Sequence, residues 1–248
     1  MYQTLLTIWI AAAVAAFVAL LRIPAPYGRH RSERWGPTMF SALGWLAMEL
    51  PSPIILTFFV LEGQQIKTAV TWLFVALWWV HYINRSILYP LRIRGSGSRI
   101  PIAVVCMGFA FHVFNGYIVG SYFGENGPVY RFEWLSSPAF VIGSVLFLSG
   151  MWINLRSDGE LIRQRRNAHG RYIIPRGGLF DYVSAPNYLG EIVEWLGFAV
   201  MTWSPAALAF AIWTAANLAP RAISHHKWYR ETFPDYPEER KALVPFVV

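Results

Sequence analysis

The sequence predicts an all-α membrane protein with several transmembrane helices, and three observations indicate this class. Hydrophobic residues make up 55% of the 248 residues and charged residues only 14%, whereas soluble domains carry about a quarter charged residues. The mean hydropathy is +0.37, so lipid must solvate much of the surface. The apolar residues also form long runs without the alternation that is typical of strands.

Each transmembrane helix needs about 20 mostly apolar residues. Seven segments of the chain meet that length, and only Trp203, Ser204 and Pro205 separate the last two, which predicts a tight helical hairpin. The first segment lacks a charged leader and a cleavage motif, so we expect it to be retained. Without repeats or low-complexity linkers, residues 1–248 form one predicted domain. The predicted spans are 3–22, 37–61, 66–90, 101–123, 134–155, 179–203 and 205–224.

The net charge of +7 indicates membrane topology rather than a nucleic-acid partner. The basic residues cluster in alternate connectors between the spans and after the last one, which places the N-terminus outside and the C-terminus in the cytoplasm. An odd number of spans agrees with termini on opposite sides. The single Cys106 excludes an intrachain disulfide and a cysteine-based metal site. We therefore expect a multi-pass integral protein of a bacterial inner membrane or the endoplasmic reticulum.

Polar groups inside the spans are the candidate functional residues, because an ionisable residue at bilayer depth costs about 2.5–3.5 kcal/mol. Glu49 lies beside Pro51 and Pro53, which interrupt the backbone hydrogen bonds of a helix. Trp45 lies one turn earlier on the same face. In apolar surroundings a carboxylic acid favours its neutral form and can donate a hydrogen bond. The alternative is a structural ion pair in which Glu49 holds two helices together through an arginine.

A second polar group ends the third predicted span. Tyr82 by itself is typical of the aromatic belt at a membrane interface. His81, Asn84 and Arg85 surround it in the sequence, and this combination favours the wall of a polar pocket.

A third group combines the end of the fifth span with the start of the sixth. Asn154 and Asp158 are four residues apart and share a helix face, although each also suits a C-terminal cap at the water boundary. Asn187 and Glu191 share a face in the same way, and we expect Ser184 to cap their helix at its N-terminus.

The last span carries a polar stripe at its cytoplasmic end. Arg221, His225 and Tyr229 recur at intervals of four residues and therefore share one helix face. The arginine-rich connector before the sixth span suits bidentate contacts with phosphate groups as well as topology. The chain contains no Gly-x-Gly-x-x-Gly, Walker A or His-Glu-x-x-His sequence, so we expect neither a Rossmann domain nor a bound metal.

Several blocks of the sequence together resemble the steroid 5α-reductase family, most clearly in the C-terminal half. The blocks read Asn-Leu-Arg-Ser-Asp, Ile-Pro-Arg-Gly-Gly-Leu-Phe and Asn-Tyr-Leu-Gly-Glu-Ile-Val-Glu-Trp, followed by Arg-Ala-Ile-Ser-His-His-Lys-Trp-Tyr, Phe-Pro-Asp-Tyr-Pro and Arg-Lys-Ala-Leu-Val-Pro-Phe. Glu-Leu-Pro and His-Tyr-Ile-Asn-Arg match nearer the N-terminus. In order of position, these blocks are 49–51, 81–85, 154–158, 174–180, 187–195, 221–229, 233–237 and 240–246.

The resemblance implies a seven-helix reductase that takes NADPH from the cytoplasmic side and a steroid, or a related enone lipid, from the membrane. It places Glu49 and Tyr82 at the 3-keto oxygen as catalytic residues and Trp45 against the steroid. It implies neither an obligate protein partner nor a nucleic acid. The implied cofactor-binding residues are Arg94, Asn154, Asp158, Arg166, Tyr172, Asn187, Glu191, Arg221, His225 and Tyr229.

The implied reaction is the reduction of the 4,5 double bond of a 3-oxo-4-ene steroid by hydride transfer to C5. A neutral Glu49 and Tyr82 would stabilise the negative charge that develops on the carbonyl oxygen, as an oxyanion hole does. Two other functions remain open from the sequence. One is a membrane methyltransferase of the isoprenylcysteine type that uses S-adenosylmethionine, and the other is a non-catalytic sterol or lipid carrier.

Overall fold

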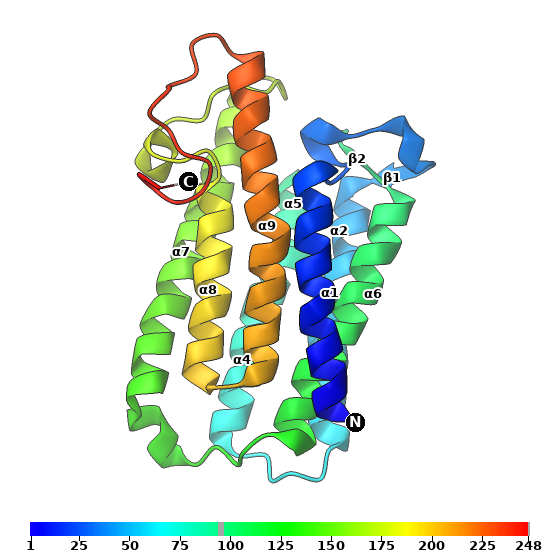
Figure 1. Cartoon of the computed structure of the whole chain (residues 1–248), viewed down its shortest axis with the longest axis vertical. Helices are drawn as coiled ribbons and strands as arrows, with labels where there is room; N and C mark the ends of the chain where they lie inside the picture. The colour runs from blue at the N-terminus through cyan, green and yellow to red at the C-terminus, as the bar shows by residue number, and fades with distance from the viewer. Residues whose placement is uncertain (94–96, 248) are drawn as a thin grey trace. The chain divides into compact units, whose positions relative to one another are not determined.

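The computed structural model describes residues 1–93 and 97–247, and these are almost entirely helical (Figure 1). Two short strands occur in this part of the chain, β1 (Thr38–Phe40) and β2 (Arg99–Pro101). The helices are α1 (Tyr2–Arg22), α2 (Ser41–Glu49), α3 (Pro51–Glu62), α4 (Ala69–Ile83), α5 (Tyr89–Ile93), α6 (Ile102–Ser121), α7 (Pro138–Asn167), α8 (Pro186–Thr202) and α9 (Pro205–Thr232).

The helices form two compact units. Unit 1 consists of Met1–Tyr2 and Ala25–Val141 and contains α2 to α6 with both strands. Unit 2 consists of Gln3–Pro24 and Ile142–Val248 and contains most of α1 together with α7, α8 and α9.

In unit 1, glycines bring α6 into close contact with α2 and α3. A Cβ atom at Gly108 would lie 2.7 Å from the sulfur of Met48, and one at Gly116 would lie 2.9 Å from the backbone oxygen of Ser52. Small residues allow such approaches between membrane helices. Between these glycines, His112 and Asn115 of α6 are buried among the neighbouring helices.

The two strands of unit 1 pair in the antiparallel direction, with Thr38 opposite Pro101 and Met39 opposite Ile100. Arg99 strengthens the pair because its Nε donates to the Thr38 hydroxyl at 2.8 Å and its Nη2 to the Thr38 backbone oxygen at 2.7 Å. The sequence predicted a membrane span from residue 37, so this start is wrong by a few residues. Strand pairing with a distant segment takes up residues 38–40, and α2 begins at Ser41.

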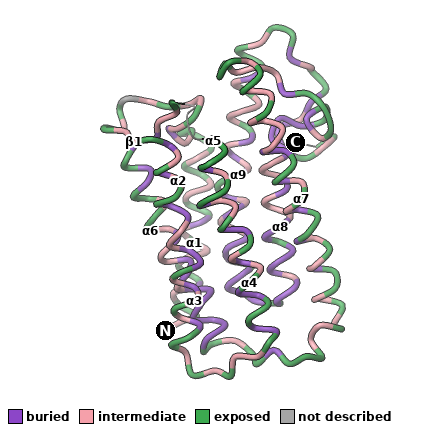
Figure 2. Tube along the Cα trace, turned by 180° about the vertical axis from the view of Figure 1, so that it is seen from behind, coloured by how far each residue is buried: buried purple, intermediate pink, exposed green. Residues whose placement is uncertain are grey.

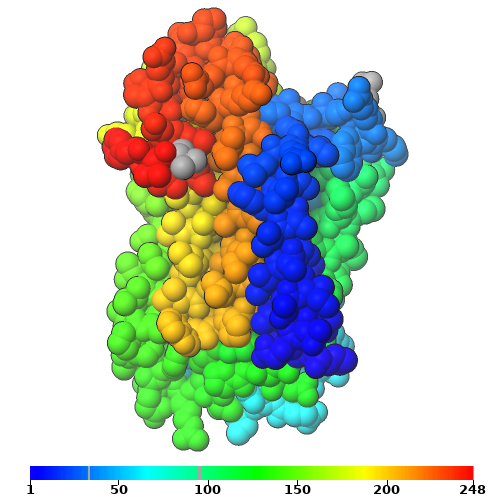
Figure 3. Space-filling view, viewed as in Figure 1, coloured from blue at the N-terminus to red at the C-terminus, as the bar shows by residue number. Residues whose placement is uncertain are grey.

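In unit 2, α8 and α9 form the predicted hairpin (Figure 1). Trp203 makes the turn in a left-handed conformation with φ of 47°, and the hydroxyl of Ser204 accepts from the backbone N–H of Ala207 at 3.2 Å. The space-filling view shows α1, in dark blue, alongside α9, in orange (Figure 3). The indole N–H of Trp213 there donates to the backbone oxygen of Trp9 at 2.9 Å.

Within residues 1–93 and 97–247, five helical segments are long and apolar enough to cross a membrane. They correspond to the first, second, fourth, fifth and seventh predicted spans. The other two predicted spans contain α4, which has 15 residues before a π-helical turn, and α8, which has 17 residues. The multi-pass, all-α class is thus supported, while the count of seven spans and the topology stay predictions. The five segments are Tyr2–Arg22, Ser41–Glu62, Ile102–Asn126, Pro138–Asn167 and Pro205–Thr232.

The outer face of α7 shows why these helices need lipid. Large apolar side chains on this helix are exposed mostly at intervals of three or four residues, which places them on one face. Figure 2 marks the exposed positions along α7 in green. A continuous apolar surface of this kind is unfavourable in water and favourable against acyl chains. The exposed residues are Val141, Ile142, Val145, Leu148, Trp152 and Leu155.

Candidate functional site

The first group of site residues lies in unit 1 around Glu49. Glu49 is the last residue of α2 and Pro51 is the first of α3, so the predicted interruption of the helix lies beside the carboxylate. The side chain is buried, and its Oε2 lies 3.2 Å from Nε2 of His112 on α6. Arg85 and His81 also act electrostatically on Glu49. The direct partner of this carboxylate is therefore an imidazole.

Tyr82 contacts the same imidazole from α4. Its hydroxyl oxygen lies 3.4 Å from Nδ1 of His112, and the two rings are nearly perpendicular at 84°. Tyr82 is only 1% exposed, which contradicts the alternative of an aromatic-belt residue at the interface. The structure brings Glu49 and Tyr82 to the two nitrogens of one histidine.

A π-helical turn, Asn84–Leu88, follows Tyr82 directly. Such turns are rare and occur frequently at functional sites. Arg85 in this turn lies over two aromatic rings, with its Cζ 4.9 Å from the centroid of Trp45 and 5.3 Å from that of Tyr89. Trp45 thus lies beside a cation, one turn before Glu49. Its contact with a substrate stays a prediction.

His112 and Asn115 on α6 were not among the predicted site residues. Both lie inside the predicted span 101–123, so the rule that singled out Glu49 applied to them as well. Asn115 is one turn from His112 and is 0% exposed. Neither its Nδ2 nor its Oδ1 has a hydrogen-bond partner among the described residues.

We expect Asn115→Leu to raise the melting temperature of the ligand-free protein by about 2–12 °C. Each unpaired buried polar group costs about 1–3 kcal/mol, and 1 kcal/mol corresponds to about 2–4 °C in a protein of this size. Thermal unfolding in detergent measures the shift, with Met107→Leu at an exposed position of α6 as the control. A lower melting temperature would show that the amide is paired in the ligand-free protein.

The second group of site residues lies in unit 2, where α7 meets the start of α8. Asn154 donates from Nδ2 to the backbone oxygen of Asn187 at 3.0 Å and to Oε2 of Glu191 at 3.2 Å. Asn187 donates from its own Nδ2 to Oδ1 of Asp158 at 2.9 Å. Four predicted cofactor residues are therefore connected by three hydrogen bonds.

The sequence ended this span at residue 155 and left a C-terminal cap as an alternative for Asn154 and Asp158. Both expectations are wrong, because α7 continues to Asn167 and buries the two side chains to 2% and 5% exposure. Hydrogen bonds to α8 hold them inside unit 2, at a position that hydropathy does not reveal.

Arg221 and His225 on α9 meet at Tyr188 of α8. Arg221 donates from Nη2 to the Tyr188 hydroxyl at 3.1 Å, and its Cζ lies 5.2 Å from the ring centroid. The ring of His225 lies 5.5 Å from the same tyrosine. Tyr188 was not among the predicted site residues, although it follows Asn187 directly. The third residue of the stripe, Tyr229, is instead stacked on Tyr236 at 5.3 Å.

The arginine-rich segment contributes Tyr172 and Arg165. The Cζ of Arg165 lies 4.3 Å from the centroid of Tyr172, and the ring of Trp228 on α9 lies 5.3 Å from it. Arg166 is exposed at the end of α7. Arg94 lies outside the described residues.

Ser184 does not cap α8, and this prediction is wrong. The N-cap residue is Ala185, and Pro186 begins the helix. The Ser184 hydroxyl lies instead 2.7 Å from Nδ1 of His226 and 2.6 Å from the hydroxyl of Tyr236. These contacts bind the segment after α9 to unit 2 and compete with capping.

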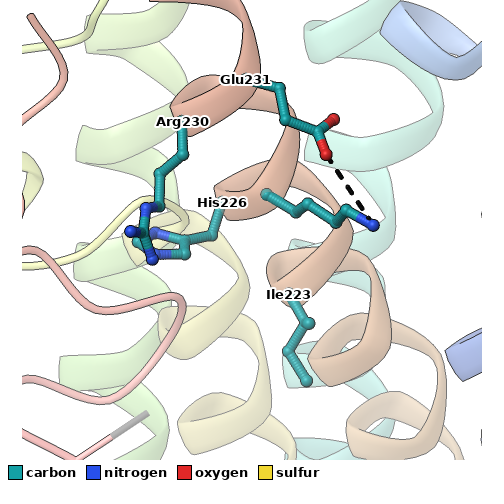
Figure 4. A pocket seen from close by; sticks show the side chains of 5 residues that line it. Ile223, His226, Arg230 and Glu231 are labelled. Carbon is teal, nitrogen blue, oxygen red and sulfur yellow. Dashed lines mark ion pairs between the residues drawn. The ribbon is translucent and has the colours of Figure 1, made fainter. Parts of the chain in front are cut away.

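The face of α9 that carries His226 also lines a surface pocket of about 400 Å³. The charged groups on its two sides differ (Figure 4). His226 and Arg230 lie together on one side, and on the other Lys227 forms an ion pair with Glu231 at 3.8 Å. The lining residues are Ile223, His226, Lys227, Arg230 and Glu231, which do not include any residue predicted for the substrate or the cofactor.

Glycines bring α7 and α8 together beneath the hydrogen-bonded group of unit 2. A Cβ at Gly150 would lie 2.2 Å from the backbone nitrogen of Glu194, and one at Gly190 would lie 2.5 Å from that of Asn154. Backbone atoms of packed helices cannot move aside as a flexible side chain does. The spacing of the site therefore depends on these glycines.

We expect Gly150→Ala to lower the free energy of unfolding by about 1–3 kcal/mol, the usual cost of overpacking. The added methyl group would push α7 from α8 and weaken the hydrogen bonds of Asn154. Thermal unfolding in detergent measures the loss. Val145→Ala, at an exposed position of the same helix, is the control. Equal melting temperatures for both variants would contradict the close contact.

Comparisons with known proteins agree with the resemblance. The family model described as 3-oxo-5-alpha-steroid 4-dehydrogenase matches residues 98–248. Steroid 5-alpha-reductase DET2 of Gossypium hirsutum is 42% identical over 251 residues, which cover 99% of this chain and 96% of that protein. The protein of the same name from Arabidopsis thaliana is 40% identical over 93% of this chain and 90% of its own length. The 3-oxo-5-alpha-steroid 4-dehydrogenase 1 of Bos taurus is 40% identical over 96% and 93%, respectively.

Proposed function

This chain belongs to the 3-oxo-5-alpha-steroid 4-dehydrogenase family, and we propose that it uses NADPH to reduce the 4,5 double bond of 3-oxo-4-ene steroids. The members compared are named as oxidoreductases that act on a CH–CH bond, so the chain is an enzyme of this class. Membership of this family contradicts the two alternatives, a methyltransferase and a non-catalytic carrier.

Glu49 and Tyr82 are the proposed donors to the 3-keto oxygen. Addition of a hydride to C5 moves negative charge onto that oxygen, and donors directed at it stabilise the transition state. C4 then takes a proton from solvent or a bound water. The observation that carries this proposal is the meeting of Glu49 and Tyr82 at His112 in buried surroundings. Two hydrogen-bonding groups from different helices converge there.

Apart from Arg94, which lies outside the described residues, the proposed cofactor residues belong to unit 2. NADPH, when bound, supplies the hydride that adds to C5. The connected amide and carboxylate groups of Asn154, Asp158, Asn187 and Glu191 offer the mixed donors and acceptors that hydroxyl and carboxamide groups need. A phosphate group needs cations, which the remaining residues offer together with aromatic rings. These are Arg94, Arg166, Tyr172, Arg221, His225 and Tyr229.

The membrane arrangement is part of the same proposal. We propose seven transmembrane helices with the N-terminus outside and the C-terminus in the cytoplasm. Five sufficiently long apolar helices and the alternating charge of the connectors support it. A steroid would reach the protein through the lipid, and NADPH from the cytoplasm. The membrane would be a bacterial inner membrane or the endoplasmic reticulum.

The test is the oxidation of NADPH by the purified protein with a panel of 3-oxo-4-ene steroids. We expect steroid-dependent loss of NADPH absorbance and a product reduced at the 4,5 bond, identified by mass spectrometry. NADPH binding is measured separately through the quenching of tryptophan fluorescence. Absence of NADPH binding in every lipid and detergent tried would contradict the proposal.

A further inference from the structure

The imidazole of His112 contacts both proposed carbonyl donors, one through each nitrogen. Nε2 lies 3.2 Å from Oε2 of Glu49, and Nδ1 lies 3.4 Å from the hydroxyl oxygen of Tyr82. All three residues are buried: His112 is 9% exposed, Glu49 is 7% exposed and Tyr82 is 1% exposed. Bulk water therefore cannot readily replace these contacts.

The packing of α6 holds this imidazole in place. Gly108 and Gly116 lie one turn before and one turn after His112, and both allow close contact with neighbouring helices. The rings of His112 and Tyr82 meet edge to face at 5.5 Å. The histidine is thus positioned by helix packing as well as by its two polar partners.

The number of protons on Glu49 and His112 decides where the proton of Tyr82 points. A neutral imidazole has one N–H and one acceptor nitrogen. When Nε2–H donates to a Glu49 carboxylate, Nδ1 can only accept, and it draws the hydroxyl proton of Tyr82 away from a substrate. A protonated imidazole donates through both nitrogens, so the Tyr82 oxygen accepts and its own proton can be directed at a carbonyl oxygen.

We propose that His112 is a positioning residue for the reduction, which shares one proton with Glu49 and orients the hydroxyl group of Tyr82. This inference rests on the proposed function. The shared proton lies either on Glu49 or on His112, and the two forms hold equal numbers of protons. In the first form Glu49 donates to the ketone through its other oxygen, and in the second Tyr82 does. Loss of the shared proton removes the donor in either form.

The proposal predicts one alkaline ionisation in the rate of steroid reduction. Among the described residues, Glu49 of α2 and Tyr82 of α4 are the titratable groups in contact with His112, while Arg85 and His81 act on Glu49. Glu49 and His112 are two sites for one proton, so the pair ionises as a unit rather than as two separate groups. Removing the imidazole leaves Glu49 alone, and the fall in rate should move to lower pH.

The experiment measures kcat and KM against pH for the wild type, His112→Gln and His112→Phe. Glutamine keeps a neutral donor for Glu49, whereas phenylalanine keeps only the ring. We expect His112→Phe to lower kcat by about tenfold to a hundredfold, the size of one charge-assisted hydrogen bond. We expect His112→Gln to keep more activity, with its alkaline fall shifted to lower pH. His169→Asn, which removes an exposed histidine with φ of 53°, is the control.

NADPH binding by fluorescence and thermal unfolding establish that each variant is folded. A purely structural role for His112 would change the melting temperature but not the pH at which the rate falls. If the pH profile of His112→Gln matches that of the wild type, or its kcat lies within about twofold of it at all pH values, the positioning role is wrong. A wild-type protein that binds NADPH but reduces no enone would overturn the proposed function and this inference together.

Discussion

Glu49→Ala should lower the kcat of steroid reduction by about two to three decades, the usual effect of removing one donor from an oxyanion site. The variant removes a proposed donor to the ketone and the direct partner of His112 Nε2 at 3.2 Å. Glu49→Gln should keep far more activity, because its amide can donate to the carbonyl oxygen while its oxygen accepts from the imidazole. Steady-state kinetics at saturating NADPH measure both variants.

The comparison of these two variants separates two chemical roles of Glu49. If Gln and Ala lose activity equally, the reaction needs the charged carboxylate rather than a hydrogen-bond donor. Met48→Leu is the control, because it changes the preceding buried residue of α2 while conserving volume. Unchanged kcat in Glu49→Ala would contradict a catalytic role for this residue.

Arg221→Met should raise the Kd for NADPH by about tenfold to a hundredfold, with a smaller change of kcat at saturation. The variant removes a cation that is fixed by the hydroxyl and the ring of Tyr188. A hydrogen bond to a charged group contributes about 1.5–3 kcal/mol, which sets the expected range. Arg221→Lys should lie between the wild type and Arg221→Met, because an ammonium group keeps the charge but loses the planar geometry.

Fluorescence titration with NADPH measures the three Kd values. Lys227→Gln is the matched control, since it removes one positive charge from an exposed position on the same helix, where Lys227 pairs with Glu231. We expect this control to bind NADPH as the wild type does. Equal Kd values for Arg221→Met and Lys227→Gln would show that Arg221 does not hold the cofactor.

The polar groups inside apolar spans were the most informative part of the sequence. The cost of burying Glu49 at bilayer depth singled it out without any knowledge of its neighbours. The same physical rule applied to His112 and Asn115, but their sequence surroundings do not indicate which residues they contact. Only the packing of α6 against its neighbours revealed that His112 lies between Glu49 and Tyr82. Contacts of this kind join residues of three helices, and they cannot be predicted from the sequence around each residue.

The ends of elements were predicted less well than their existence, for a related reason. Hydropathy ended the fifth span at residue 155, whereas α7 continues through a polar stretch to Asn167. Asn154 donates hydrogen bonds to α8 and Asp158 accepts one from it, and these bonds replace the water that the two side chains would otherwise require. Ser184 shows the opposite error, since contacts with His226 and Tyr236 outweigh its local preference for a helix cap.

Composition and hydropathy by themselves determined that this protein is a helical membrane protein, because water cannot solvate so much apolar surface. The spacing of polar residues and the matching sequence blocks determined its family and most of the candidate site. Tertiary structure alone decided which side chains meet, since a hydrogen bond depends on distances of a few ångströms between helices that are far apart in the chain. Tertiary structure alone therefore decided two sets of contacts. Glu49 and Tyr82 both contact His112, and Arg221 and His225 both contact Tyr188.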